Sequence, residues 1–515
     1  MIGPDALLSP DTAPMRPDVD VGAWFDDLRA RRPTVGLVVG VARDDDVRFH
    51  SAGLADIPSG TPMSPDTVVR IASITKTFTA IAVMQLWERG QVDLDGPAND
   101  YLRSYQLVDT DAGYGPVTPR HLLTHTAGLP EVAHPSGLVR PDFGESFRVG
   151  TPLPTLAEFY GGALRIQAEP GTRFVYNNHG PATLGQLVED VSGMPLARYF
   201  REHIFDPLGM ADSDLERSEH VESRRATGYE IRGDGVEAVE ERDMVTAGAA
   251  SVFSTPADMG RYLTALLGGG SNEHGSILRP DTLATMFEPQ YRPDPRVPGM
   301  GLGFFRSRIS DRVLAGHQGT HPGFHSHISL APGRRVGVMG FTNGARQADF
   351  WLPAAVSSLA GSLIGAVPDP TPVAARPELW SDLSGWYRLQ AGPTDVRLRG
   401  MLGLGAEVVI RHGRPMFRFL TPVPTLARAR PLIPDDAADP LVFRFELGEG
   451  FDPMRVVFGR NGSGAIDRVN LEVMPLTLHK QSAATNPRKW TSAVLGSAAV
   501  AALWRGARRD GRSGR

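Results

Sequence analysis

The pattern of apolar and polar positions changes near residue 366. Before that point, segments with helical and strand periodicity alternate. The stretch "TVGLVVGVARDDDVRFHSAG" predicts a hairpin, because two extended runs flank an Asp-rich turn. "GPATLGQLVEDVSG" and "STPADMGRYLTALLGGG" predict helices that end on glycine. Interleaved helices and strands predict one α/β or α+β domain over residues 21–366. We expect the Pro- and Asp-rich lead-in, residues 1–20, to be disordered.

Beyond residue 366 the pattern becomes that of an all-β domain. Residues 367–378 contain a run of prolines, which predicts a stiff, extended linker. In residues 379–481, segments such as "EVVIRHGRPMFRF" and "LVFRFELGEG" alternate apolar and polar positions. The dipeptide His412-Gly413 falls where a tight hairpin turn is needed. We therefore expect a small antiparallel β-barrel or sandwich.

Residues 482–515 form an Ala-rich apolar segment followed by a basic tail. Between Trp490 and Trp504 there is no charge, and basic residues flank this stretch on both sides. As a helix the stretch would reach only about 22 Å, against about 30 Å of hydrocarbon, so a comfortable membrane span is not expected. Two interpretations stay open. In the first, the tail stays off the membrane, as a helix docked on the protein or as a disordered basic end. In the second, it attaches weakly to an anionic membrane surface.

Composition narrows the classes of function. The net charge of −5 gives no electrostatic reason to expect a nucleic acid as partner. The chain has no cysteine, which excludes disulfides, a thiol nucleophile and thiolate zinc sites. The amino terminus lacks a basic start followed by a long apolar run, so the sequence predicts no secretory signal. We therefore expect a cytoplasmic location, and membrane association through the tail stays open.

Candidate chemistry begins at one lysine. Only three of the 53 basic residues are lysine, and Lys76 is the first of them, in "RIASITKTF". Arginine cannot give up its proton, whereas a buried lysine can act as a base. Ser73 lies three residues before Lys76 at the start of a predicted buried helix, so the two side chains share one face. This pair is typical of an activated nucleophile, and the alternative is a helix cap beside a snorkelling lysine.

Two further segments contribute candidate groups. In "FVYNNHG", Tyr176 and Asn178 precede a helix; a tyrosine whose pKa is lowered by a nearby ammonium can shuttle protons, and an amide can bind a substrate carbonyl. The alternative is a loop with a packed tyrosine. In "LAGHQGTHPGFHSHISL", Gly319 can let a substrate lie against an extended backbone, and the imidazole of His317 could approach that substrate. The four histidines of this segment have no carboxylate among them, so we expect no metal and no cofactor.

Together, the order S-x-x-K, Y-x-N and H-x-G resembles the penicillin-recognising serine hydrolases. Within them it is most similar to the branch of class C β-lactamases, D-alanyl-D-alanine carboxypeptidases, D-aminopeptidases and related serine esterases. The segments "VTPRHLLTHTAGLPE", "HIFDPLGMADS" and "AGAASVFSTPADMGRYL" look like framework segments of that family. The resemblance implies a β-lactamase/transpeptidase-like domain with a central antiparallel sheet and a helical subdomain. The β domain resembles the small lipocalin-like domain often fused to such enzymes.

The resemblance also implies roles for the candidate residues. Ser73 would form the acyl-enzyme, Lys76 would help to deprotonate it, and Tyr176 would pass the proton to the leaving group and later activate water. Asn178 would hold the substrate, beside His317 on the edge strand. The implied substrate-binding residues are Asn178, His317, Gly319 and Thr320. The backbone N–H groups of Ser73 and Thr320 would hold the oxyanion.

The sequence constrains the substrate class less than it constrains the type of reaction. Many β-lactamases carry lysine where this chain has His317, and a largely neutral imidazole loosens the demand for an anionic substrate. This favours an esterase that acts on a small ester, with amides and lactams as related partners. The alternatives are a β-lactamase or D-amino-acid peptidase with the same residues, and a catalytically idle binding module.

Overall fold

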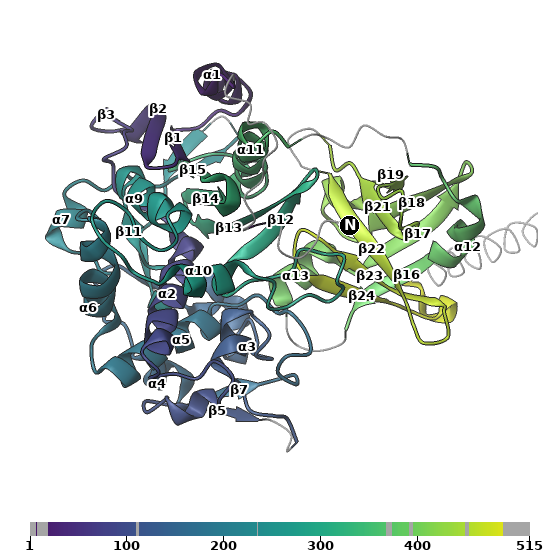
Figure 1. Ribbon diagram of the computed structural model, residues 1–515, viewed down its shortest axis with the longest axis horizontal. Coiled ribbons are helices and arrows are strands. Elements are labelled where there is room, and N and C mark those ends of the chain that lie inside the picture. The colour runs from purple at the N-terminus through teal and green to yellow at the C-terminus, as the bar shows by residue number, and fades with distance from the viewer. Residues whose placement is uncertain are drawn as a thin grey trace, which may run out of the picture.

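The structure is a computed structural model in which a large mixed α and β region lies beside a smaller sheet built from the C-terminal part of the chain (Figure 1). It describes residues 7, 19–109, 113–233, 235–366, 373–390, 395–448 and 453–487. Leu7 is buried, and its carbonyl accepts a hydrogen bond from the Gly333 amide at 3.1 Å. The other residues of 1–18, part of the 367–378 segment and the basic tail from residue 488 lie outside the described residues.

A seven-stranded antiparallel sheet forms the centre of the large region, in the order β12-β13-β14-β15-β1-β2-β3. The predicted N-terminal hairpin is confirmed as β1 and β2, and the late strand "VGVMGFT" closes onto β1 as β15. The strands are β1 (Gly36–Arg43), β2 (Asp46–Asp56), β3 (Thr61–Pro62), β12 (Phe305–Ile309), β13 (Arg312–His321), β14 (Phe324–Ala331) and β15 (Val336–Thr342).

Side chains alternate between the two faces of this sheet. Val39 and Val41 of β1 pack with the helices on one face, whereas Val38 and Ala42 join the larger core on the other. Helices α1 (Val21–Arg31) and α11 (Ala348–Leu363) contribute to the first layer, and α2 (Thr75–Glu88), α5 (His179–Ser192) and α9 (Pro256–Leu267) to the second. The central strands of the sheet, such as β1 and β15, are therefore buried between two helical layers (Figure 1).

The helix that follows the candidate serine runs through the centre of the second layer. Every residue of α2 from Thr75 to Leu86 is buried, which confirms the burial predicted from the nearly all-apolar run Phe78–Met84. It packs against α5, which ends on Gly193 in the left-handed conformation, and against the short helix α8 (Ala247–Ala250). The remaining helices of this region are α3 (Pro119–Leu123), α4 (Leu156–Tyr160), α6 (Leu196–Phe200), α7 (Glu219–Glu222) and α10 (Pro280–Phe287).

Short strand pairs hold the loops of the helical layer. Most of them are antiparallel, and β5 and β7 are parallel. They are β4 (Val69–Arg70) with β11 (Phe253–Ser254), β6 (Ser146–Arg148) with β10 (Arg242–Met244), β5 (Gln106–Asp109) with β7 (Ala163–Ile166), and β8 (Tyr229–Arg232) with β9 (Gly235–Ala238).

The second sheet, here named the C-terminal barrel, has nine strands in the order β19-β18-β17-β16-β24-β23-β22-β21-β20 and curls into a nearly closed barrel. Its strands are β16 (Gly385–Leu389), β17 (Ala406–Arg411), β18 (Arg414–Phe419), β19 (Arg430–Pro431), β20 (Ile433–Pro434), β21 (Val442–Phe445), β22 (Met454–Arg460), β23 (Ile466–Leu471) and β24 (Leu476–Lys480). Its helices are α12 (Trp380–Leu383), α13 (Val396–Leu402) and α14 (Pro424–Ala427).

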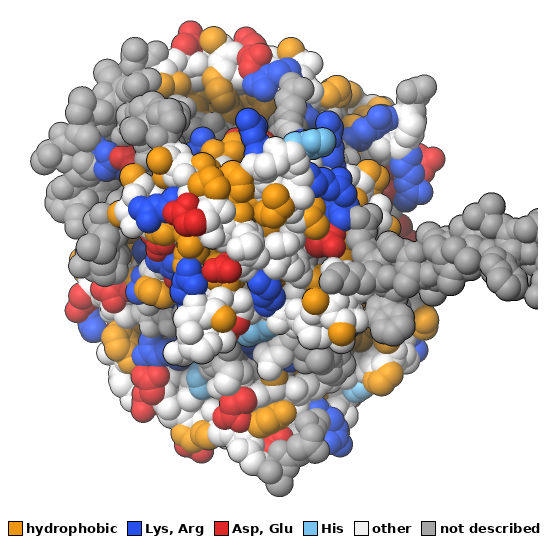
Figure 2. Space-filling model, turned by 90° about the vertical axis from the view of Figure 1, so that its right-hand side faces the viewer, with side chains coloured by type: hydrophobic (Ala, Val, Ile, Leu, Met, Phe, Trp, Pro, Cys, Tyr) orange, Lys and Arg blue, Asp and Glu red, His pale blue; other side chains and the backbone are white. Residues whose placement is uncertain are grey.

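The barrel confirms the period-two pattern of the sequence. Phe443, Phe445 and Leu447 are buried in its core, while Arg444 between them is half-buried. The turn between β17 and β18 is His412-Gly413, and both residues have positive φ, as a tight hairpin requires. Figure 2 shows the right-hand side of Figure 1 face-on, and hydrophobic, basic and acidic side chains are intermixed on this face. Among the described residues, no helix is long and apolar enough to cross a membrane.

Candidate active site

Ser73 lies in a one-turn 3-10 helix, Ala72–Ile74, that leads directly into α2. Ala72 adopts a positive φ of 48°, which is a strained conformation for a residue with a side chain. The turn is held against the central sheet, because Ser326 of β14 donates a hydrogen bond to the Ile71 carbonyl at 2.8 Å. A Cβ atom on Gly319 would lie 2.1 Å from the same carbonyl oxygen. Glycine is therefore required for β13 to approach the Ser73 turn.

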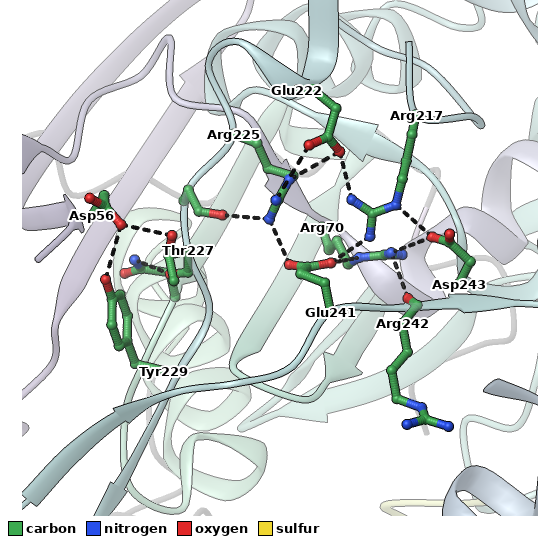
Figure 3. A network of polar contacts seen from close by, with 12 residues as sticks. Asp56, Arg70, Arg217, Glu222, Arg225, Thr227, Tyr229, Glu241, Arg242 and Asp243 are labelled. Carbon is green, nitrogen blue, oxygen red and sulfur yellow. Dashed lines mark hydrogen bonds and ion pairs between the residues drawn. The ribbon is translucent and has the colours of Figure 1, made fainter. Parts of the chain in front are cut away.

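A buried charge cluster holds the strand before this turn (Figure 3). The Arg70 side chain is 1% exposed; it donates to the Arg242 carbonyl at 2.7 Å and pairs with Glu241 and Asp243. Arg217 pairs with the same two carboxylates. Because β10 contains Arg242 and pairs with β6, the cluster ties the serine strand to the segment after residue 145. A buried charge of this kind is tolerated only when it is fully paired.

Lys76 makes the contact with Ser73 that the spacing of three predicts. Its Nζ donates to Ser73 Oγ at 2.8 Å, to Asn178 Oδ1 at 2.9 Å and to the Ala249 carbonyl at 3.0 Å. Burial lowers the pKa of Lys76 to about 7, against the attraction of the Glu145 carboxylate, which raises it. A substantial fraction of this amine is therefore neutral at neutral pH, which an arginine could not achieve.

The orientation of Asn178 depends on Glu145, a residue that sequence reasoning missed. Asn178 Nδ2 donates to Glu145 Oε2 at 2.9 Å, so its Oδ1 faces Lys76. Thr246 also donates to this carboxylate, at 2.9 Å. Glu145 is 1% exposed, and no motif in the sequence marks it. Both ends of the Asn178 amide are thus engaged within the protein.

Tyr176 lies beside the lysine, with Nζ of Lys76 5.0 Å from the centre of its ring. The rings of His125 and Phe305 are 4.6 and 6.0 Å away, centre to centre. Burial raises the pKa of Tyr176 to about 12, although a hydrogen bond with Ser73 opposes the shift. The expectation that a nearby ammonium lowers this pKa is therefore wrong, because desolvation outweighs the hydrogen bond with Ser73 and the charge of Arg397. The phenol is protonated at neutral pH and can donate a proton.

His317 is buried on β13, beside Phe305 at 5.2 Å and Tyr176 at 6.3 Å between ring centres. Its Nδ1 is bonded to the Gln318 carbonyl at 2.7 Å, and Nε2 has no hydrogen-bond partner among the described residues. Burial lowers the pKa of His317 to about 3, with the charge of Lys76 adding to the shift. The imidazole is therefore neutral, as the sequence analysis expected for this position.

Thr320 follows at the end of β13. Strand β12 pairs with β13 only from Arg312 to Gly316, so Thr320 lies beyond that pairing, next to Gly319, which approaches the Ile71 carbonyl. The Thr320 hydroxyl donates to Asp349 at the start of α11, and His325 shares the same carboxylate at 3.0 Å. No group of three or more potential metal ligands lies together within the part of the chain that the structure describes.

Two more residues near the site were missed from the sequence. The ring of His125 lies beside Tyr176, and its backbone has a positive φ of 56°. It stands in "LLTHTAGLP", a segment that only the family resemblance singled out. Arg397 belongs to α13 of the C-terminal barrel, yet its charge lowers the pKa of both Lys76 and Tyr176. Nothing in the sequence around Arg397 links it to residues more than 200 positions earlier.

A serine and a buried lysine in direct contact, beside a protonated tyrosine, are the parts of an acyl-transferring serine hydrolase. Comparisons with known proteins agree with this class. The family model described as Beta-lactamase matches residues 21–357. Esterase EstB of Burkholderia gladioli is 32% identical over 337 residues, 58% of this chain and 82% of that protein. Penicillin-binding protein 4 of Amycolatopsis lactamdurans is 27% identical over 383 residues, 72% of this chain and 97% of that protein.

Solved structures share the fold over most of the chain. An octameric penicillin-binding protein homologue from Pyrococcus abyssi superimposes with a TM-score of 0.56 at 24% identity, covering 90% of this chain and all of that one. A structure described as SurE gives a TM-score of 0.55 at 22% identity, covering 90% of this chain and 98% of that one. The chain belongs to the β-lactamase family and is a serine hydrolase.

Proposed function

We propose that this enzyme is an esterase that cleaves small acyl compounds through an acyl-enzyme on Ser73. The contact that supports this most directly is the 2.8 Å hydrogen bond between Lys76 Nζ and Ser73 Oγ, made by an amine whose pKa is about 7. The neutral amine takes the Ser73 proton as the hydroxyl attacks the acyl carbon. The oxyanion that forms is held by the backbone N–H groups of Ser73 and Thr320.

Tyr176 completes the proton path. Its protonated phenol gives a proton to the departing alcohol, and the resulting phenolate takes one from water in the second step. The hydroxide formed from this water attacks the acyl carbon, and the departing Ser73 oxygen takes its proton back from the Lys76 ammonium. With its amide held between Lys76 and Glu145, Asn178 keeps the lysine aligned, and its contact with a substrate carbonyl remains a prediction.

Removing the Tyr176 hydroxyl tests this path. We expect Tyr176→Phe to lower kcat by about 10²- to 10⁴-fold, the usual contribution of a positioned general acid or base. The ring would still fill its place beside His125, so the melting temperature should change little. Steady-state kinetics on a p-nitrophenyl ester give the comparison. A variant with a near-normal kcat would refute the role of the phenol.

Ester hydrolysis is favoured over lactam hydrolysis because His317 is neutral, so this position of β13 offers no fixed positive charge to a lactam carboxylate. A similar protein, EstB, is named an esterase, which agrees with this reading. We expect kcat/KM for a short-chain p-nitrophenyl ester to exceed that for nitrocefin. A higher value for nitrocefin would replace the proposal by a β-lactamase or D-peptidase function, which the relatives named penicillin-binding proteins keep open.

A catalytically idle binding module is disfavoured by the same geometry. An idle protein has no need to keep a partly neutral lysine buried against a serine, because burying an amine costs free energy. Labelling of the intact protein with a fluorophosphonate probe separates the two cases, since only an activated serine reacts.

A further inference from the structure

Helix α13 of the C-terminal barrel lies against the tyrosine side of the active site. The apolar core of the barrel includes Leu402 of α13 and extends to Phe174 of the large region, with Leu398 also packed on it. Tyr176 and Phe305 pack against the same cluster. The barrel therefore forms one wall beside the catalytic tyrosine.

Arg397 stands on this helix and contacts Glu131 and Phe143 in the segment 131–145. Its backbone amide donates to Glu131 Oε2 at 2.9 Å, and its Nε lies 3.4 Å from Glu131 Oε1. The guanidinium lies over the ring of Phe143, 4.6 Å from its centre. The segment ends on Glu145, which holds Asn178 against Lys76. These contacts place Arg397 next to the residues that surround Ser73.

The Arg397 guanidinium holds the loop and is still partly open to solvent. Its side chain is 52% exposed, although the backbone around it is anchored. Unlike Lys76, arginine keeps its charge at every physiological pH. Its planar group can bind a carboxylate through two parallel hydrogen bonds. The ion pair with Glu131 is made through Nε, at one edge of that group.

The other charged groups near the site would not attract an anionic substrate. His317 on β13 is neutral, and the buried lysine is partly neutral. The carboxylate of Glu131 pairs with Arg397, and the carboxylate of Glu145 contacts Asn178. Without Arg397, a substrate with a negative charge would meet little fixed positive charge here and two nearby carboxylates, which oppose its binding.

We propose that Arg397 binds a carboxylate of the substrate, so that the C-terminal barrel selects anionic esters for the serine site of the other region. This inference rests on the proposed esterase function and names the substrate class more closely. It does not require the carboxylate to lie on a particular side of the ester bond, so the test covers both sides.

Two matched pairs of esters separate charge from bond type. The acyl pair is p-nitrophenyl hexanoate and mono-p-nitrophenyl adipate, which differ by a terminal carboxylate. The leaving-group pair is p-nitrophenyl acetate and 5-acetoxy-2-nitrobenzoate. For each enzyme the measured quantity is the ratio of kcat/KM for the anionic ester to that for the neutral ester, after subtraction of hydrolysis without enzyme.

We expect Arg397→Gln to lower this ratio about tenfold in at least one pair, the size expected for one charged hydrogen-bonded contact. Arg397→Lys should keep part of the preference, because it keeps the charge but not the planar group. Arg414→Gln is the control: this exposed arginine begins β18, beyond the hairpin turn, and its loss should leave the ratio unchanged. Added salt should weaken the wild-type preference.

The ratio also distinguishes binding from a purely structural clamp. If Arg397 only holds the loop, Arg397→Gln lowers both rates in each pair equally and leaves the ratios within about twofold of wild type, which overturns the inference. Ser73-dependent turnover with unchanged ratios overturns the inference alone. A protein that cleaves none of the four esters overturns the proposed function, and this inference with it.

Discussion

Replacing Ser73 by alanine is expected to abolish ester turnover and labelling by a fluorophosphonate probe, with kcat reduced by at least about 10⁴-fold. The hydroxyl is the only group on this turn that can form the acyl-enzyme, and it is the one that Lys76 contacts at 2.8 Å. Whatever rate remains would come from binding and from the backbone donors alone. Probe labelling followed by mass spectrometry of the labelled peptide gives the measurement.

The fold should survive this change. Lys76 keeps two of its three acceptors, Asn178 and the Ala249 carbonyl, when the serine oxygen is lost. One hydrogen bond of this kind contributes about 1 kcal/mol, so the melting temperature should fall by only a few degrees. Labelling that persists in a folded Ser73→Ala protein would mean that another nucleophile does the chemistry.

Much of the fold could be predicted because its signals are local. Gly193 ends α5 in the left-handed conformation that favours glycine, and the His412-Gly413 turn takes the two positive φ values that a tight hairpin needs. The spacing of Ser73 and Lys76 on one helical face is equally local, and the contact between them is confirmed. Such features depend on neighbours within four residues.

The parts that could not be predicted depend on long-range contacts. Glu145 reaches Asn178 across 33 positions, and Arg397 meets Glu131 across 266. Neither residue stands in a periodic pattern or a motif that would signal its partner. The predicted direction of the Tyr176 pKa shift was wrong for a related reason: the motif shows that a lysine is near, but the burial that raises this pKa is set by the whole fold.

Replacing Lys76 by arginine is expected to be nearly as damaging as replacing it by alanine, with kcat/KM lowered by about 10³-fold or more in both. Arginine keeps the positive charge but cannot become a base at any pH the fold tolerates. The wild-type lysine must be neutral to accept the Ser73 proton, and burial lowers its pKa from 10.5 to about 7. Activity of the wild type should therefore rise with pH through about 7 and level off above it.

The pH profile distinguishes a base from a permanent positive charge, because a permanent charge would not make the activity rise with pH near 7. In wild type, the rise of kcat/KM near pH 7 reports the free enzyme's base, whereas the small residual activity of Lys76→Arg should lack this limb. Melting curves of both variants show whether the buried site still folds, since Asn178 and the Ala249 carbonyl lose their donor in Lys76→Ala. A folded Lys76→Arg enzyme that keeps more than about a tenth of wild-type activity would show that Lys76 acts through its charge. The base would then be another group, with Tyr176, which is hydrogen-bonded with Ser73, the first to test.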